Sequence, residues 1–171
     1  ARPEAGVAEH GGSHAPTPAA AAAGADIVLS CGGDDPDVLQ VALGPDGAIL
    51  AMREGAIYID NSTVSADVAR KLAAAGNARG ISALDAPVSG GQAGAENGKL
   101  TVMVGGAKDT FDLALAVMQC YGARVVHMGA AGPGQHAAPR GRATAQLGSR
   151  TARESTEFYG RSLIGIRFGR L

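Results

Sequence analysis

The sequence predicts an α/β fold with a doubly wound, mostly parallel sheet, and three observations support this prediction. Short β-branched apolar runs alternate with Ala-rich stretches of helical period along most of the chain. Hydrophobic residues make up 46% of the 171 residues, whereas aromatic residues make up only 4%. A core of Val, Ile, Leu, Met and Ala suits helices that pack closely on a sheet, and the alternation of strands with helices requires crossover connections.

The first predicted elements are a short helix and a buried strand. Thr17 is placed as the N-cap of the helix, with Pro18 at its first position and Gly24 as its C-terminal stop. The run DIVLSC, residues 26–31, follows directly. It is apolar enough for a strand that is buried on both faces.

The same alternation continues to residue 128. Asp34 or Asp35 is predicted to cap the next helix, and Ser65 the one after it. The predicted helices span residues 36–43, 66–75 and 109–120, and the predicted strands span residues 56–60, 81–85, 100–104 and 124–128. Strand–helix–strand units of this kind predict a parallel sheet.

The composition changes at about residue 136. The net charge of the whole chain is −1, but residues 139–171 contain seven arginines, no lysine and two glutamates, for a charge of +5. This part has no apolar period, and only SLIGIRF, residues 162–168, predicts a short strand or an apolar hook. We therefore predict one domain over residues 1–135 and an irregular, Arg-rich tail over residues 136–171.

Several classes of function are disfavoured. The nearly neutral charge and the lack of a nucleic-acid motif argue against a nucleic-acid partner. No apolar run is long enough to span a membrane, and residues 1–12 do not resemble a signal peptide. Two cysteines, Cys31 and Cys120, lie among apolar residues and are predicted to be buried thiols in a reducing compartment, so a cytoplasmic location is expected.

No metal site is predicted. His10 and His14 are four residues apart, but the two glycines between them argue against the helix that would bring both side chains to one ion. Both histidines are expected in surface loops.

Candidate site residues follow three of the predicted strands. Ligands of open parallel sheets bind beyond the carboxyl ends of the strands. Three strands end there in small polar residues, Ser30–Gly33, Asp60–Thr63 and Asp85–Gly91, which we expect on one rim. The two aspartates are expected to hydrogen-bond neighbouring loops rather than to act as bases. Ser89 is not expected to be an acyl nucleophile, because the glycine that a nucleophile elbow needs two residues earlier is missing.

The stretch LDAPVSGGQAGAENGKLTVMVGG, residues 84–106, resembles the signature of the β-hydroxyacid dehydrogenase family. This family includes 3-hydroxyisobutyrate dehydrogenase, tartronate semialdehyde reductase and 6-phosphogluconate dehydrogenase. Asp60–Thr63 is similar to the family's Asp-x-Ser-Thr element, and Gly129–Gln135 resembles the glycine-rich start of its long interdomain helix. The resemblance covers roughly residues 1–135.

The resemblance implies a Rossmann-like domain that binds NAD or NADP and a hydride transfer at the carbinol carbon of a small hydroxy acid. It places Ser89, Gly90 and Gly91 on the substrate carboxylate, and Gly32, Gly33 and Thr63 on the cofactor. A hydroxyl group and backbone amides can donate to an anion without the burial of a charge.

The chain also departs from the family pattern. Where the family has its catalytic lysine and an asparagine, this sequence has Ala138 and Gly141, and Pro139 is expected to interrupt the helix that carries them. The glycine-rich fingerprint of the family is expected before Ala1, so we interpret the chain as N-terminally truncated, with an unpaired edge on the strand at residues 26–31.

These departures predict a chain that is inactive as it stands and that binds NAD or NADP only weakly. An oligomer is not expected without the family's helical domain. Two alternatives stay open: a non-catalytic module that binds a nucleotide or a carboxylate, and a truncated or frameshifted gene product without function. The sequence leaves open the choice between NAD and NADP and the identity of the hydroxy acid.

Overall fold

The computed structural model describes residues 13–137 and 162–166. The strands are β1 (Ile27–Cys31), β2 (Ile57–Asp60), β3 (Ser82–Asp85), β4 (Val88–Ser89), β5 (Leu100–Gly105), β6 (Gly122–Gly129) and β7 (Ser162–Ile166). The helices are α2 (Pro18–Ala22), α3 (Asp35–Leu43), α4 (Ala48–Ala51), α5 (Ala66–Asn77), α6 (Gly91–Glu96), α7 (Lys108–Met118) and α8 (Pro133–Ala137).

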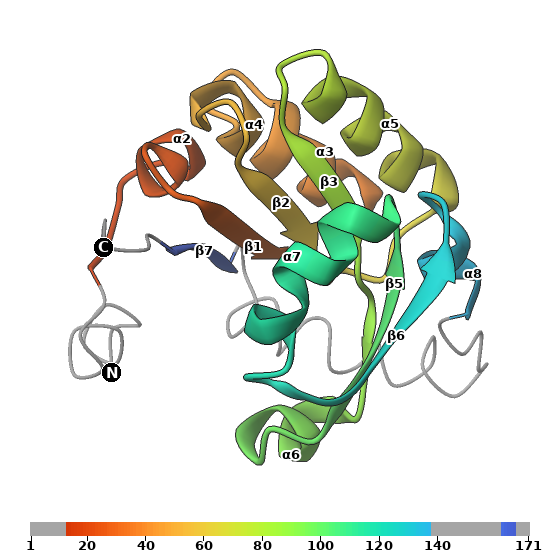
Figure 1. The fold of residues 1–171 in the computed structure, drawn as a ribbon. Helices are drawn as coiled ribbons and strands as arrows, with labels where there is room; N and C mark the ends of the chain where they lie inside the picture. Colours follow the sequence, from red (N-terminus) through yellow and green to blue (C-terminus); the bar gives the residue numbers. More distant parts are fainter. Residues whose placement is uncertain (1–12, 138–161, 167–171) are drawn as a thin grey trace.

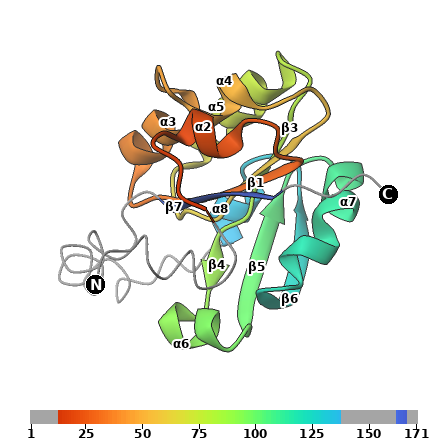
Figure 2. The ribbon, with the colours of Figure 1, turned by 90° about the vertical axis from the view of Figure 1, so that its left-hand side faces the viewer.

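The elements form three layers, with one sheet between two layers of helices. The strand order is β4-β5-β3-β2-β1-β7, and β6 lies beside β5. Helices α2, α3, α4 and α5 cover one face of the sheet, and α7 covers the other (Figure 1, Figure 2). Each face has its own core, with Val28, Tyr58 and Ile81 buried under α2–α5, and Ile59, Leu84 and Val102 buried under α7.

The predicted helix starts are confirmed by their capping bonds. The Thr17 side chain accepts from the Ala20 amide at 3.1 Å, and the Ser65 side chain accepts from the Val68 amide at 3.3 Å. Asp34 caps α3 through the Asp37 amide at 3.0 Å. Asp35 was the other candidate, and its carboxylate instead accepts from the Ser65 amide at 2.9 Å, which joins the starts of α3 and α5.

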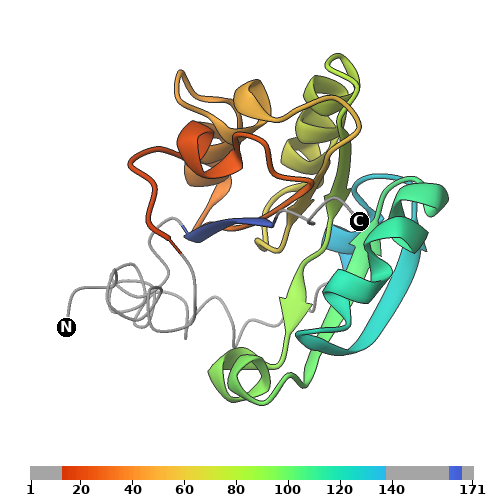
Figure 3. The ribbon, with the colours of Figure 1, turned by 60° about the vertical axis from the view of Figure 1, so that its left-hand side comes forward.

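The mostly parallel α/β class is confirmed, with antiparallel pairings at β5 and at β7. β1 pairs in parallel with β2, β2 with β3, and β5 with β6. β5 runs antiparallel to β3 and β4, so the connection through α6 is not the predicted crossover. β3 and β5 share only the pair Asp85 and Gly105, while β4 continues to pairs such as Val88 and Val102. As a result, β4 and α6 project beyond the carboxyl ends of β1, β2 and β3 (Figure 3).

The outer edge of β1 is paired, so the expectation of an open edge at residues 26–31 is wrong. All five residues of β1 pair antiparallel with β7, from Ile27 with Ile166 to Cys31 with Ser162. The blue strand beside β1 in Figure 3 is this partner. The short strand predicted over residues 162–168 is confirmed for Ser162–Ile166. His10, Ala138, Pro139 and Gly141 lie outside the described residues.

The two thiols are less buried than the sequence suggested. Cys31 is half-buried and Cys120 is exposed, so the prediction of a buried thiol is wrong for Cys120. Both are free thiols. Among the described residues, no helix is both long and apolar enough to cross a membrane.

Candidate functional site

Three strands end side by side at one edge of the sheet. The parallel register places Ser30 beside Asp60, and Asp60 beside Asp85. The loops that follow β1, β2 and β3 therefore leave the sheet at the same edge, as the sequence predicted. We call this edge, residues 30–33, 60–63 and 85, the rim.

Asp60 joins the ends of β1 and β2. Its Oδ1 atom accepts from the Ser30 hydroxyl at 3.0 Å, the Ser62 hydroxyl at 2.5 Å and the Ser62 amide at 3.2 Å. The Ser62 hydroxyl in turn accepts from the Gly32 amide at 2.7 Å. Only 1% of Asp60 is exposed, and this burial raises the pKa of its carboxyl group, although the bonds from Ser62 and Ser30 oppose the rise.

Asp85 joins the end of β3 to the start of α8. Its two carboxylate oxygens accept from the Gly132 amide at 2.7 Å and the Gln135 amide at 3.2 Å. Burial raises the pKa of Asp85, and the amide bonds from Gly132 and Gln135 oppose the rise. Both aspartates therefore hydrogen-bond neighbouring loops, which confirms the structural role expected for them.

The residues predicted to touch a cofactor lie on the rim above this network. Gly33 and Thr63 are exposed, and Gly32 is half-buried. A Cβ atom at Gly32 would lie 2.8 Å from the Cγ2 atom of Val38, so the loop passes closer to α3 than a side chain allows. The surface at this point is made largely of backbone.

The residues predicted to hold a carboxylate lie farther out. Ser89 ends β4 and Gly91 begins α6, with φ angles of +139° at Gly90 and +61° at Gly91 that favour glycine. Ser89 follows Asp85 by four residues of extended chain, which is about 13 Å. The expectation of a shared rim is confirmed for Asp85, whereas Ser89–Gly91 lie farther along β4 and α6.

Two side chains at this edge were not among the predicted site residues. The Tyr121 hydroxyl donates to the Asn61 side chain at 3.0 Å, and burial raises the pKa of Tyr121 to about 12. The Gln135 side chain bonds to the backbone next to Thr63. These contacts join residues 60 or more positions apart, and no periodic signal in a single sequence marks them.

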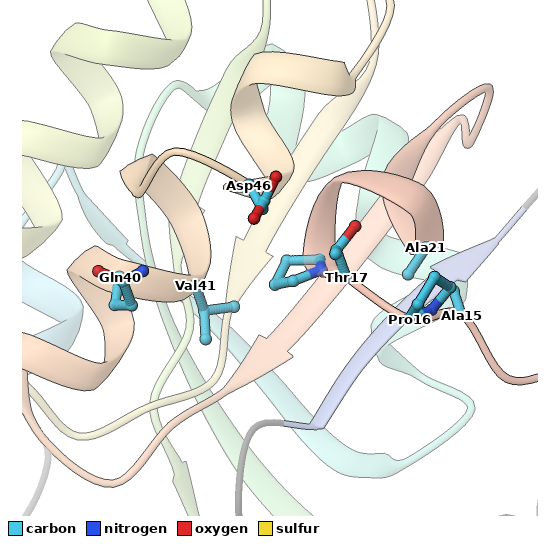
Figure 4. A pocket seen from close by; sticks show the side chains of 8 residues that line it. Ala15, Pro16, Thr17, Ala21, Gln40, Val41 and Asp46 are labelled. Carbon is cyan, nitrogen blue, oxygen red and sulfur yellow. The ribbon is translucent and has the colours of Figure 1, made fainter.

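A cavity of about 350 Å³ lies elsewhere, between α2 and α3 (Figure 4). Thr17, Gln40, Val41 and Asp46 are among its lining residues. α3 begins at the rim and runs away from it. Gln40 and Val41, near its C-terminus, therefore lie toward the amino ends of the strands. This cavity is separate from the rim. Among the described residues, no cluster of three His, Cys, Asp or Glu side chains could hold a metal ion.

A family model described as the NAD binding domain of 6-phosphogluconate dehydrogenase matches residues 2–129. The chain belongs to this family. An uncharacterised oxidoreductase of Shewanella frigidimarina is 50% identical over 129 residues, which are 75% of this chain and 44% of the relative. The mitochondrial 3-hydroxyisobutyrate dehydrogenase of Mus musculus is 37% identical over 129 residues, 75% of this chain and 38% of the relative.

Solved structures of this family have the same fold. The 3-hydroxyisobutyrate dehydrogenase of Mycobacterium tuberculosis, solved with L-serine, superimposes with a TM-score of 0.72 at 36% identity, over 78% of this chain and 45% of that one. Psf3, solved with NADP+ and 2-OPP, gives a TM-score of 0.71 at 28% identity, over 75% of this chain and 46% of that one. The chain thus spans less than half the length of each of these four proteins.

Proposed function

We propose that the chain is the dinucleotide-binding part of an NAD- or NADP-dependent dehydrogenase that acts on a small β-hydroxy acid. The observation that carries this proposal is the rim itself. Gly33 and Thr63 are exposed residues next to a buried hydrogen-bond network that joins the ends of β1 and β2. Such a surface can receive a dinucleotide closely and without a change of shape.

The proposed roles follow the family resemblance. Gly32, Gly33 and Thr63 contact the cofactor, and Ser89, Gly90 and Gly91 hold the carboxylate of the hydroxy acid. The bound cofactor supplies the nicotinamide that exchanges a hydride with the carbinol carbon.

By itself, the chain is proposed to bind without turnover. The position of the family's catalytic lysine is Ala138, whose methyl side chain cannot move a proton to or from the substrate hydroxyl. A division into a domain over residues 1–135 and a tail over residues 136–171 is part of the same proposal. A cytoplasmic location and the absence of an oligomer stay predictions.

The proposal is tested by calorimetric titration of the purified chain with NADH and with NADPH. We expect saturable binding of at least one of them, and Thr63→Ala is expected to weaken it by about tenfold through the loss of one contact. The matched control is Thr101→Ala, which removes the same atoms from a half-buried threonine on β5, outside the rim. No binding of either dinucleotide would refute the cofactor proposal.

The carboxylate site is tested with 3-hydroxyisobutyrate added to the chain at saturating NAD+ or NADP+, the oxidised forms that can accept a hydride from the acid. Ser89→Ala is expected to weaken binding of this acid and leave the dinucleotide affinity unchanged, with Ser82→Ala as the control. Oxidation of the acid by the purified chain, above a blank, would contradict the proposal that it binds without turnover. Dinucleotide binding without any effect of the acid favours the alternative of a nucleotide-binding module.

A further inference from the structure

The Gln135 side chain hydrogen-bonds to the backbone on both sides of Thr63. Its Oε1 atom accepts from the Val64 amide at 3.0 Å, and its Nε2 atom donates to the Ser62 carbonyl at 2.9 Å. The exposed fraction of Gln135 is only 6%, whereas Thr63 between the two bonds is exposed. The two bonds therefore lie beneath the surface that Thr63 presents to solvent.

A glutamine is well suited to this position. One planar amide supplies an acceptor and a donor at a fixed spacing, and the two backbone groups require one of each. An apolar side chain of similar size would leave both backbone groups buried without these partners. An ionised carboxylate could accept from Val64 but could not donate to Ser62.

Gln135 is itself held by two strands. The backbone amide of Gln135 donates to the Asp85 carboxylate at the end of β3, at 3.2 Å. The preceding residue, Gly134, passes so close to the sheet that a Cβ atom there would lie 2.5 Å from the Asp85 Oδ2 atom and 2.6 Å from the Met103 carbonyl oxygen. The start of α8 is thus seated on β3 and β5, and it carries the amide of Gln135 to the loop after β2.

The same loop is held from its other side. Ser62, which precedes Thr63, bonds through its hydroxyl group to Asp60 and to the Gly32 amide. Thr63 is therefore the exposed residue of a segment whose neighbours are fixed by two separate networks, one from β1 and β2 and one from α8.

We propose that Gln135 is a positioning residue that holds Thr63 and its flanking backbone in the conformation required for dinucleotide binding. This inference rests on the proposed function of the rim. We call the two side-chain bonds of Gln135 to Val64 and Ser62 the clamp. A segment that is already ordered loses less conformational entropy when a ligand binds. Loss of the clamp therefore weakens binding even where the overall fold persists.

The test uses the full chain and the variant Gln135→Met, which keeps the volume of the side chain and removes both bonds. We expect the exchange protection of the Val64 amide to fall by about tenfold or more, as for the loss of one buried hydrogen bond. The dissociation constant for the dinucleotide is expected to rise by a similar factor of about ten. Gln119→Ala, at an exposed glutamine, is the matched control and is expected to change neither quantity.

Gln135→Glu provides a rescue that a merely structural role would not give. A protonated carboxyl group has the acceptor and the donor that the amide had, and burial at this position favours its protonated form. Compared with the wild-type chain at each pH, this variant is expected to keep Val64 protection and dinucleotide affinity at about pH 5 and to lose both by about pH 8. It also carries the test if Gln135→Met does not fold.

Val64 exchange and dinucleotide affinity test two different proposals, the role of Gln135 and the function of the rim. Failure of the wild-type chain to bind any dinucleotide would refute the proposed function and, with it, the role of Gln135 toward a cofactor, while Val64 exchange would still report the clamp. Unchanged Val64 protection in a folded Gln135→Met chain would overturn the clamp itself. A loss of protection without a change in affinity would show that Gln135 orders the loop but does not serve the ligand, which would also overturn the proposal.

Discussion

At the scale of single residues, Asp60 and Tyr58 are two buried polar side chains of β2 beneath the rim. The Oδ1 atom of Asp60 accepts three hydrogen bonds, while its Oδ2 atom has no partner among the described residues. The hydroxyl group of Tyr58 has no partner at hydrogen-bond distance within the same residues. Burial raises the pKa of Tyr58, and the neighbouring Ser30 side chain opposes the rise. A buried polar group without a partner lowers stability.

The first prediction concerns Asp60 and pH. Burial raises the native pKa of Asp60 above its ordinary value of 3.8, so the folded chain keeps a proton that the unfolded chain has lost. Its contribution to stability is complete below pH 3.8 and is lost as the pH rises through the native pKa. Asp60→Asn is expected to reduce this loss, by up to about 1.4 kcal/mol per pH unit.

Urea unfolding at a series of pH values between acid and neutral measures this slope. Some pH dependence is expected to remain in the variant, because burial also raises the pKa of Asp85. An identical slope in the wild-type chain and in Asp60→Asn would show that Asp60 does not retain its proton on folding.

A second prediction compares two tyrosines. Tyr58→Phe removes a buried hydroxyl group that lacks a partner among the described residues, and we expect the free energy of unfolding to stay constant or to rise by up to about 1 kcal/mol. Tyr121→Phe removes a hydroxyl group that donates to Asn61, and we expect a fall of about 1 kcal/mol. Equal losses of stability in both variants, measured by denaturant unfolding, would contradict this account of Tyr58.

At the scale of elements, β7 pairs with the outermost parallel strand, and α8 supports the loop after β2. β7 covers the outer edge of β1 with an antiparallel pairing along all five residues. α8 places Gln135 on the loop after β2. Both elements come from parts of the chain where the regular alternation of strand and helix has stopped.

The third prediction is that removal of β7 opens this edge. Deletion of residues 162–171 is expected to speed amide exchange in β1 and to promote self-association, because an unpaired strand edge can pair with another chain. Deletion of residues 167–171 alone leaves β7 in place and serves as the control. Hydrogen exchange and light scattering report the two effects, and equal exchange of β1 in both truncated chains would contradict the role of β7.

At the scale of the whole molecule, the rim and the α2–α3 cavity lie toward opposite edges of the sheet. The rim combines accessible glycine backbone with a buried supporting network, whereas the cavity is lined in part by the side chains of Gln40 and Asp46. The projecting β4 and α6 stand on the side of the rim (Figure 3).

A fourth prediction follows from this arrangement. In backbone NMR spectra, a saturating dinucleotide is expected to shift the amide signals of Gly33 and Thr63 and to leave those of Val41 and Asp46 unchanged. Binding at a preformed surface moves little of the distant backbone. Shifts confined to Val41 and Asp46 would place the ligand in the cavity instead and would contradict the proposed site.

Much of the fold could be predicted because its signals are local. The caps at Thr17, Asp34 and Ser65 satisfy amides within three residues, and the apolar strands are short runs that a reader of the sequence can see directly. The short elements β4 and α4 were not predicted, because two to four residues hold no period. The start of α8 was implied only by the family resemblance of Gly129–Gln135.

The sequence by itself determined the α/β class, the order of the main helices and strands, and the three groups of small polar residues at strand ends. Only the tertiary structure decided that β5 runs against β3, that β7 pairs with β1, and that Gln135 holds the loop of Thr63. The physical reason is the range of the interactions. Periodicity and capping act over a few neighbouring residues, whereas strand direction and buried hydrogen bonds join residues that are distant in the chain and meet only when it has folded.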